Sequence, residues 1–107
     1  MAHVARPRID IPKERIAEFC RRHRIRTLSL FGSVLRDDFG PDSDVDVLVE
    51  FEPDTRITLF ELVRMEDELK RILGREVDLV DRVQIERSEN YLRRKEILTS
   101  FETVYAS

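Results

Sequence analysis

The chain has 107 residues, of which 41% are hydrophobic and 38% charged, and its formal net charge is −3. This length allows one compact domain with a modest core, and no apolar run approaches the roughly 18–20 residues that a membrane span needs. The first residues lack the apolar stretch of a secretory signal, and a single cysteine cannot form an internal disulfide. We therefore expect a cytoplasmic protein without a membrane partner.

Hydrophobic periodicity predicts alternating helices and strands. Residues 1–11 are expected to form a flexible N-terminal arm, and residues 12–107 the folded domain. The predicted elements are, in chain order, a helix over about 12–24, a strand over 27–31, a short helix over 33–37, a strand over 44–51, a helix over about 57–73, a strand over 76–80, a helix over about 84–99 and a short strand over 101–105. This order predicts a mixed α/β (α+β) fold, with a small mixed sheet and helices packed on one side.

Acidic residues gather in the middle of the chain and predict a metal site. Residues 36–68 carry twelve acidic and three basic residues, a balance of −9. Alternate residues of a strand share a face, so Asp44 and Asp46 should point the same way, about 6.6 Å apart along the strand. Carboxylate oxygens are the ligands that magnesium prefers, and two ions could be flanked by this pair. A third carboxylate is needed; Asp78 is the first candidate and Asp81 the alternative.

A phosphate-binding turn is predicted just before this strand. Gly32 lets the backbone approach an anion closely, and Ser33 begins a short helix whose free N–H groups and hydroxyl can donate to phosphate oxygens. Arg36 could add a charged contact to a phosphate, or it could pair with a neighbouring aspartate. A phosphate turn beside a magnesium site indicates chemistry on a nucleoside triphosphate.

These residues resemble a known family. Gly32 and Ser33, followed after ten residues by Asp44 and Asp46, with Ser43 before the first aspartate, are similar to the motif of minimal nucleotidyltransferase (MNT) domains of the DNA polymerase β-like superfamily. The resemblance implies the polymerase β-like palm fold and transfer of a nucleoside monophosphate from a nucleoside triphosphate with two Mg²⁺ ions, and ATP is the substrate that we expect. It also implies that Gly32 and Ser33 contact the triphosphate, and that Asp44, Asp46 and Asp78 are metal ligands and catalytic. Ser43, from the motif, and Arg36, from the reasoning above, are the further candidates for the nucleotide site.

Many small members of that family are antitoxins encoded beside a helical HEPN toxin, and the resemblance implies the same partner here. The first hypothesis is an enzyme that attaches AMP to a tyrosine of the toxin. The alternatives are a non-catalytic antitoxin that neutralises the toxin by binding it, and a small-molecule (antibiotic) nucleotidyltransferase. The residues contain no nucleic-acid-binding motif with interleaved aromatic side chains, and a homo- or hetero-oligomer is compatible with them.

Overall fold

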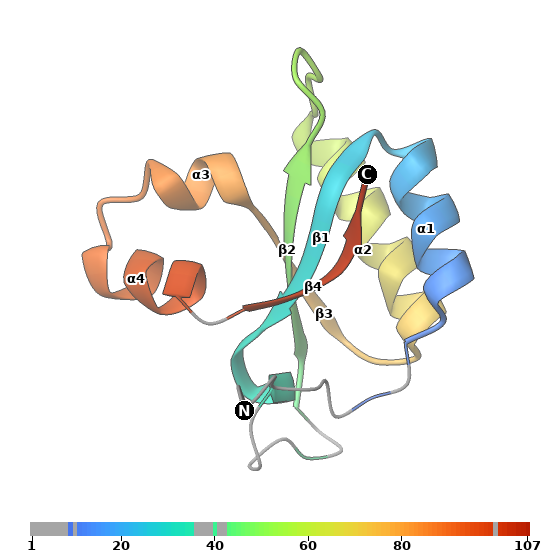
Figure 1. Cartoon of the computed structure of the whole chain (residues 1–107), viewed down its shortest axis with the longest axis horizontal. Coiled ribbons are helices and arrows are strands. Elements are labelled where there is room, and N and C mark those ends of the chain that lie inside the picture. The colour runs from blue at the N-terminus through green and yellow to red at the C-terminus, as the bar shows by residue number, and fades with distance from the viewer. Residues whose placement is uncertain (1–8, 10, 36–39, 41–42, 100) are drawn as a thin grey trace.

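The structure is a computed structural model that describes residue 9 and residues 11–35, 40, 43–99 and 101–107. The predicted arm over residues 1–11 lies largely outside these residues. The elements are α1 (Lys13–Arg22), β1 (Ile25–Phe31), the 3₁₀ turn η1 (Gly32–Leu35), β2 (Val45–Phe51), α2 (Leu59–Leu73), β3 (Val77–Asp81), α3 (Arg82–Glu86), α4 (Tyr91–Thr99) and β4 (Phe101–Ala106). The predicted mixed α/β fold is confirmed (Figure 1).

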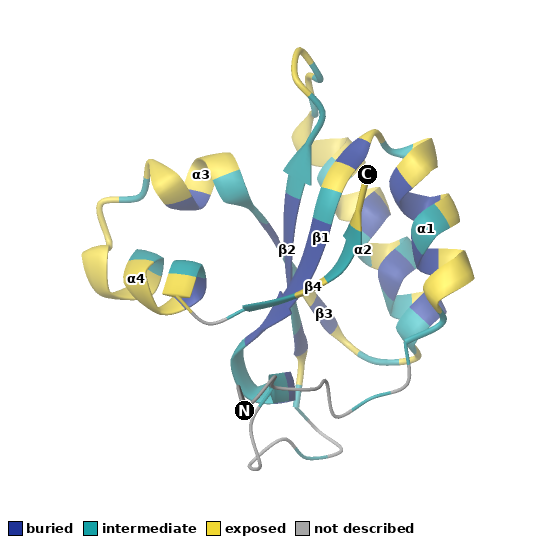
Figure 2. Ribbon diagram, in the orientation of Figure 1, coloured by how far each residue is buried: buried dark blue, intermediate teal, exposed yellow. Residues whose placement is uncertain are grey.

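The four strands form one mixed sheet in the order β3-β2-β1-β4. The central pair, β1 and β2, is antiparallel, as is the pair of β1 with β4, whereas β2 and β3 are parallel. The parallel pair is connected by α2, as such crossovers require. The two central strands carry most of the buried sheet residues (Figure 2).

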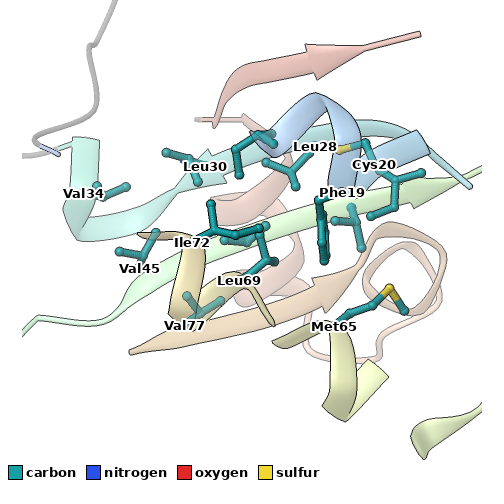
Figure 3. Close-up of a cluster of buried hydrophobic side chains, with 14 residues drawn as sticks. Phe19, Cys20, Leu28, Leu30, Val34, Val45, Met65, Leu69, Ile72 and Val77 are labelled. Atoms are coloured by element: carbon teal, nitrogen blue, oxygen red, sulfur yellow. The ribbon is translucent and has the colours of Figure 1, made fainter. Parts of the chain in front are cut away.

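The main core lies between one face of the sheet and helices α1 and α2 (Figure 3). As expected from the alternation along β2, Val45, Val47 and Val49 are completely buried on this face. Phe19 and Leu69 pack against them from the two helices. Burial of each such side chain stabilises the fold by about 1.5–3 kcal/mol, so this face fixes the register of β2 strongly.

Cys20 belongs to the same core and is fully buried. Burial raises the pKa of its thiol to about 12, because a thiolate is costly to desolvate. The side chain therefore acts as a small hydrophobe and not as a nucleophile at neutral pH.

Helices flank the sheet on both faces, whereas the sequence predicted them on one. Figure 1 shows α1 and α2 on one side of the sheet and α3 and α4 on the other. Leu48 and Val80 point away from the main core and form a second cluster with Ile85 of α3 and Ile97 of α4. Leu48 shares its strand face with acidic residues, so the sequence pattern alone gave no sign that this face is partly covered.

The prediction of a single helix over 84–99 is wrong, because the structure has two separate helices, α3 and α4, in this region. The break falls at residues 87–90, where Ser88 and Asn90 accept backbone N–H groups. The Asn90 side chain accepts from the N–H of Arg93 at 3.1 Å and begins α4. Short polar side chains of this kind favour a new helix start over a helix interior.

The predicted helix over 57–73 is confirmed as α2, with both of its ends capped. Thr58 accepts from the N–H of Glu61 at 3.2 Å, and Gly74 takes a left-handed conformation (φ +68°) at the other end. Glycine suits this position because it adopts positive φ without steric cost. In the part of the chain that the structure describes, no helix has both the length and the apolar character needed to cross a membrane.

Candidate active site

Asp46 lies at the centre of the predicted site because of the strand register. On one side it pairs with Phe31 of β1, the residue before Gly32. On the other side it pairs with Asp78 of β3. Neighbouring strands lie about 4.8 Å apart and paired residues point to the same face, so the Asp46 and Asp78 side chains emerge next to each other. The face is the one opposite the main core.

Gly32 approaches the Asp46 carboxylate so closely that no side chain would fit. Its φ is +76°, a value that favours glycine. A Cβ placed on Gly32 would overlap Oδ2 of Asp46 and lie 3.3 Å from Cγ. The predicted phosphate turn and the predicted metal ligand are therefore in direct contact, although they lie fourteen positions apart in sequence.

Ser33 follows Gly32 inside η1 and is half-buried. Its hydroxyl makes no hydrogen bond to another residue that the structure describes, so it is available as a donor to a ligand. The turn is a 3₁₀ helix that begins at Gly32, where the sequence predicted a helix beginning at Ser33. Arg36, the predicted phosphate-binding cation, lies outside the described residues.

Asp44 is exposed and immediately precedes β2. The residue before it, Ser43, closes a small turn with Gly40: the Ser43 N–H donates to the Gly40 carbonyl at 3.1 Å, and the Ser43 hydroxyl accepts from the Gly40 N–H at 3.0 Å. Ser43 thus shapes the loop before Asp44, and its hydroxyl proton remains as a donor. Asp44 and Asp46 flank Val45, whose side chain is buried on the opposite face.

Asp78, the first candidate for the third carboxylate, is in register with Asp46, whereas Asp81 is not. Asp81 pairs instead with Val49, and its Oδ1 accepts from the N–H of Val83 at 3.0 Å as the N-cap of α3. Strand register and hydrogen bonding therefore both favour Asp78 over Asp81 as the third carboxylate of the predicted metal site.

Arg93 of α4 was not foreseen from the sequence and lies next to Asp78. Its Nη2 is 3.8 Å from Oδ2 of Asp78, and the two side chains are 50% and 52% exposed. Among the described residues, no three histidine, cysteine, aspartate or glutamate side chains converge in a way that could hold a metal ion. Asp44 and Asp46 supply the oxygen donors that suit magnesium, while Asp78 forms an exposed ion pair with Arg93.

Comparison with known proteins identifies the domain. Residues 13–105 match the family model described as the nucleotidyltransferase domain. The chain belongs to this family. The match covers every helix and strand described above except the last residue of β4, and it includes the Gly32 turn, both β2 aspartates and Asp78. The predicted membership in a nucleotidyltransferase family is confirmed.

Two archaeal relatives illustrate the family. A candidate protein adenylyltransferase of Methanocaldococcus jannaschii is 38% identical over 68 residues, which are 64% of this chain and 71% of that protein. The protein adenylyltransferase MntA of Thermococcus cleftensis is 40% identical over 63 residues, which are 59% of this chain and 62% of that protein. The similarity to the Thermococcus protein therefore extends over less than two thirds of its length.

Two solved structures have the same fold. A chain in a crystal structure of a toxin–antitoxin with AMP-PNP superposes with a TM-score of 0.69 at 20% identity, covering 91% of this chain and 75% of that chain. A chain in a complex of a tri-AMPylated Shewanella oneidensis HEPN toxin with MNT antitoxin gives a TM-score of 0.61 at 21% identity, covering 89% and 70%. At sequence identities this low, the two structures establish a shared fold and nothing more.

Proposed function

We propose that this nucleotidyltransferase domain transfers AMP from ATP to a tyrosine of a HEPN-family toxin and acts as the toxin's antitoxin. The observation that carries the proposal is the contact between the Gly32 turn and Asp46, because it places the predicted phosphate-binding turn against a predicted metal ligand. The names of the relatives, protein adenylyltransferases, support the reaction. The complex of an MNT antitoxin with an AMPylated HEPN toxin supports the acceptor.

We assign a separate binding role to each residue of the proposed site. The Gly32 backbone and the Ser33 hydroxyl would bind the triphosphate, since Gly32 has no side chain that would hold phosphate away and the Ser33 hydroxyl can donate to a phosphate oxygen. Asp44 and Asp46 would hold Mg²⁺ with the nucleotide, and Asp78 would complete the shell of a second ion. Bound magnesium neutralises phosphate charge and lowers the pKa of the attacking hydroxyl.

The chemistry is a single displacement at the α-phosphorus. The tyrosine Oη forms the new bond to phosphorus, the bond from phosphorus to the oxygen bridging the α- and β-phosphates breaks, and pyrophosphate leaves. The phenolic proton is released to solvent. The role of the protein is mainly to hold the two oxygens in line across the phosphorus, and the toxin supplies the acceptor tyrosine.

Intact mass spectrometry tests the proposal. The chain is co-expressed and co-purified with a HEPN-family toxin and incubated with ATP and Mg²⁺. We expect the partner to gain about 329 Da, the mass of one adenylyl group, for each AMP attached. The variant with Asp44→Asn and Asp46→Asn is the control and should leave the partner mass unchanged. No gain with the wild-type chain would contradict AMP transfer to this acceptor.

A non-catalytic antitoxin is the second candidate, because exposed apolar side chains favour a binding surface. Leu59 and Phe60 at the start of α2 are 77% and 83% exposed, and Leu92 of α4 is 75% exposed. Neutralisation of the toxin by the double variant, without any gain of mass in the wild-type experiment, would favour binding alone.

The ion pair of Arg93 with Asp78 leads to a prediction about metal affinity. A guanidinium beside a carboxylate competes with a metal ion for it. Arg93→Gln should therefore tighten Mn²⁺ binding, by up to about fivefold, because an exposed ion pair contributes at most about 1 kcal/mol. Electron paramagnetic resonance of free Mn²⁺ measures the affinity. Lys95→Gln, which removes a charge from the same helix away from Asp78, should leave it unchanged; an equal effect of both variants would contradict a specific competition.

A further inference from the structure

The turn that joins α2 to β3 contacts the loop just before Asp44. One nitrogen of the Arg75 guanidinium, Nη2, donates to the carbonyl oxygen of Gly40 at 2.5 Å and to that of Ser43 at 3.3 Å. Gly40 and Ser43 are also hydrogen-bonded to each other in the small turn described above. Arg75 therefore fixes a turn that ends one residue before a predicted metal ligand.

The same turn also holds the backbone just after Asp44. The N–H of Val45 donates to the carbonyl oxygen of Glu76 at 2.8 Å, and Val45 then pairs with Val77 as the parallel ladder begins. Asp44 is thus bracketed by two contacts from neighbouring residues of one turn. The left-handed Gly74 starts this turn and brings Arg75 back towards the loop.

Asp44 needs such support more than Asp46 does. Asp46 lies inside β2, where paired strands on both sides fix its backbone. Asp44 lies outside the strand and is exposed, so its carboxylate direction depends on the loop. A charge-assisted hydrogen bond from a guanidinium is stronger than one between neutral groups, and the Nε of Arg75 is buried, which limits the movement of the side chain.

We propose that Arg75 is a positioning residue for the Asp44 carboxylate. Through the carbonyls of Gly40 and Ser43 it holds the loop so that Asp44 points to the same side of β2 as Asp46, where both can bind one metal ion. This role rests on the proposed metal-dependent transfer. Neither local sequence pattern nor hydrophobic periodicity signals it, because Arg75 lies 31 positions from Asp44.

Manganese affinity in a set of variants tests the proposal. Loss of a group that orients a metal ligand typically weakens metal binding by at least about tenfold, so Arg75→Gln should weaken Mn²⁺ binding in the presence of ATP by about that factor. Arg75→Lys keeps one cationic donor and should restore part of the affinity. Arg71→Gln, an exposed arginine one turn earlier in α2, is the matched control and should match the wild type.

A double-mutant cycle separates positioning from a general structural effect. If Arg75 acts through Asp44, Arg75→Gln should cause no further loss of Mn²⁺ affinity in a chain that already carries Asp44→Asn. An equal loss in both backgrounds, or an affinity of Arg75→Gln within about twofold of the wild type, would overturn the positioning role.

Amide hydrogen exchange tests the loop without any metal. Arg75→Gln should speed exchange of the Ser43 and Val45 amides and leave those inside β1 unchanged, because only the loop loses its support. If the wild-type chain shows no Asp44-dependent Mn²⁺ binding, the proposed function fails, and the exchange result alone then decides whether Arg75 orders the loop. Unchanged exchange at both amides would contradict it.

Discussion

Asp44→Asn combined with Asp46→Asn is expected to abolish AMP transfer while the chain stays folded. The substitutions keep the shape of both side chains but remove the two negative charges that would hold a divalent cation. Metal ions contribute several kcal/mol to stabilising charge in such reactions, so we expect a loss of roughly a thousandfold or more in rate. Transfer of radiolabelled AMP from ATP to the toxin measures the reaction rate. Calorimetry with ATP and Mg²⁺ measures the nucleotide affinity.

Stability should change little in this double variant. Asp44 is exposed and Asp46 half-buried, and neither belongs to the hydrophobic core. Thermal melting followed by circular dichroism should give a transition close to that of the wild type. Glu50→Gln is the matched control, since Glu50 shares the strand face of Asp46 at the far end of β2, and it should transfer AMP normally. Wild-type transfer by the double variant would remove the metal role of both aspartates.

Gly32→Ala is expected to weaken nucleotide binding through a steric effect. At a φ of +76° an alanine is strained by about 1–2 kcal/mol, and its Cβ would also collide with the Asp46 carboxylate. Either the turn or Asp46 must move, and both are parts of the proposed site. Calorimetric titration with ATP and Mg²⁺ should show a loss of at least about tenfold in affinity, the scale of 1.4 kcal/mol.

Gly74→Ala provides a close control for this effect. Gly74 has a similar φ of +68°, but a Cβ there meets no atom within 4 Å. Both variants should therefore lower the melting temperature through backbone strain, while only Gly32→Ala should lose ATP affinity. Wild-type affinity in Gly32→Ala, or an equal loss in Gly74→Ala, would contradict the assignment of Gly32 to the nucleotide turn.

Elements with a strong local signal could be predicted from the sequence. The alternation of Val45, Val47 and Val49 with acidic residues identified β2 and its buried face, because a strand places alternate side chains on opposite faces. The spacing of apolar residues likewise predicted a helix over about 57–73, and the structure places α2 at Leu59–Leu73. These preferences act within a few residues, so a single sequence contains them.

Arrangements that depend on contacts distant in sequence could not be predicted in the same way. The position of Asp78 beside Asp46 follows from the parallel register of β2 and β3, which the sequence allowed but did not require. Arg93 reaches Asp78 only because α3 and α4 lie on the second face of the sheet, which the periodicity of the chain does not encode. Arg75 reaches the loop before Asp44 through the turn after α2.

Anomalous diffraction from crystals grown with Mn²⁺ and a non-hydrolysable ATP analogue would show most directly whether Asp44 and Asp46 hold the metal of a bound nucleotide. We expect a manganese peak within coordination distance, about 2.1 Å, of one carboxylate oxygen from each aspartate, with the triphosphate against Gly32 and Ser33. A nucleotide bound elsewhere on the chain, or a metal ion that contacts neither aspartate, would contradict the proposed active site.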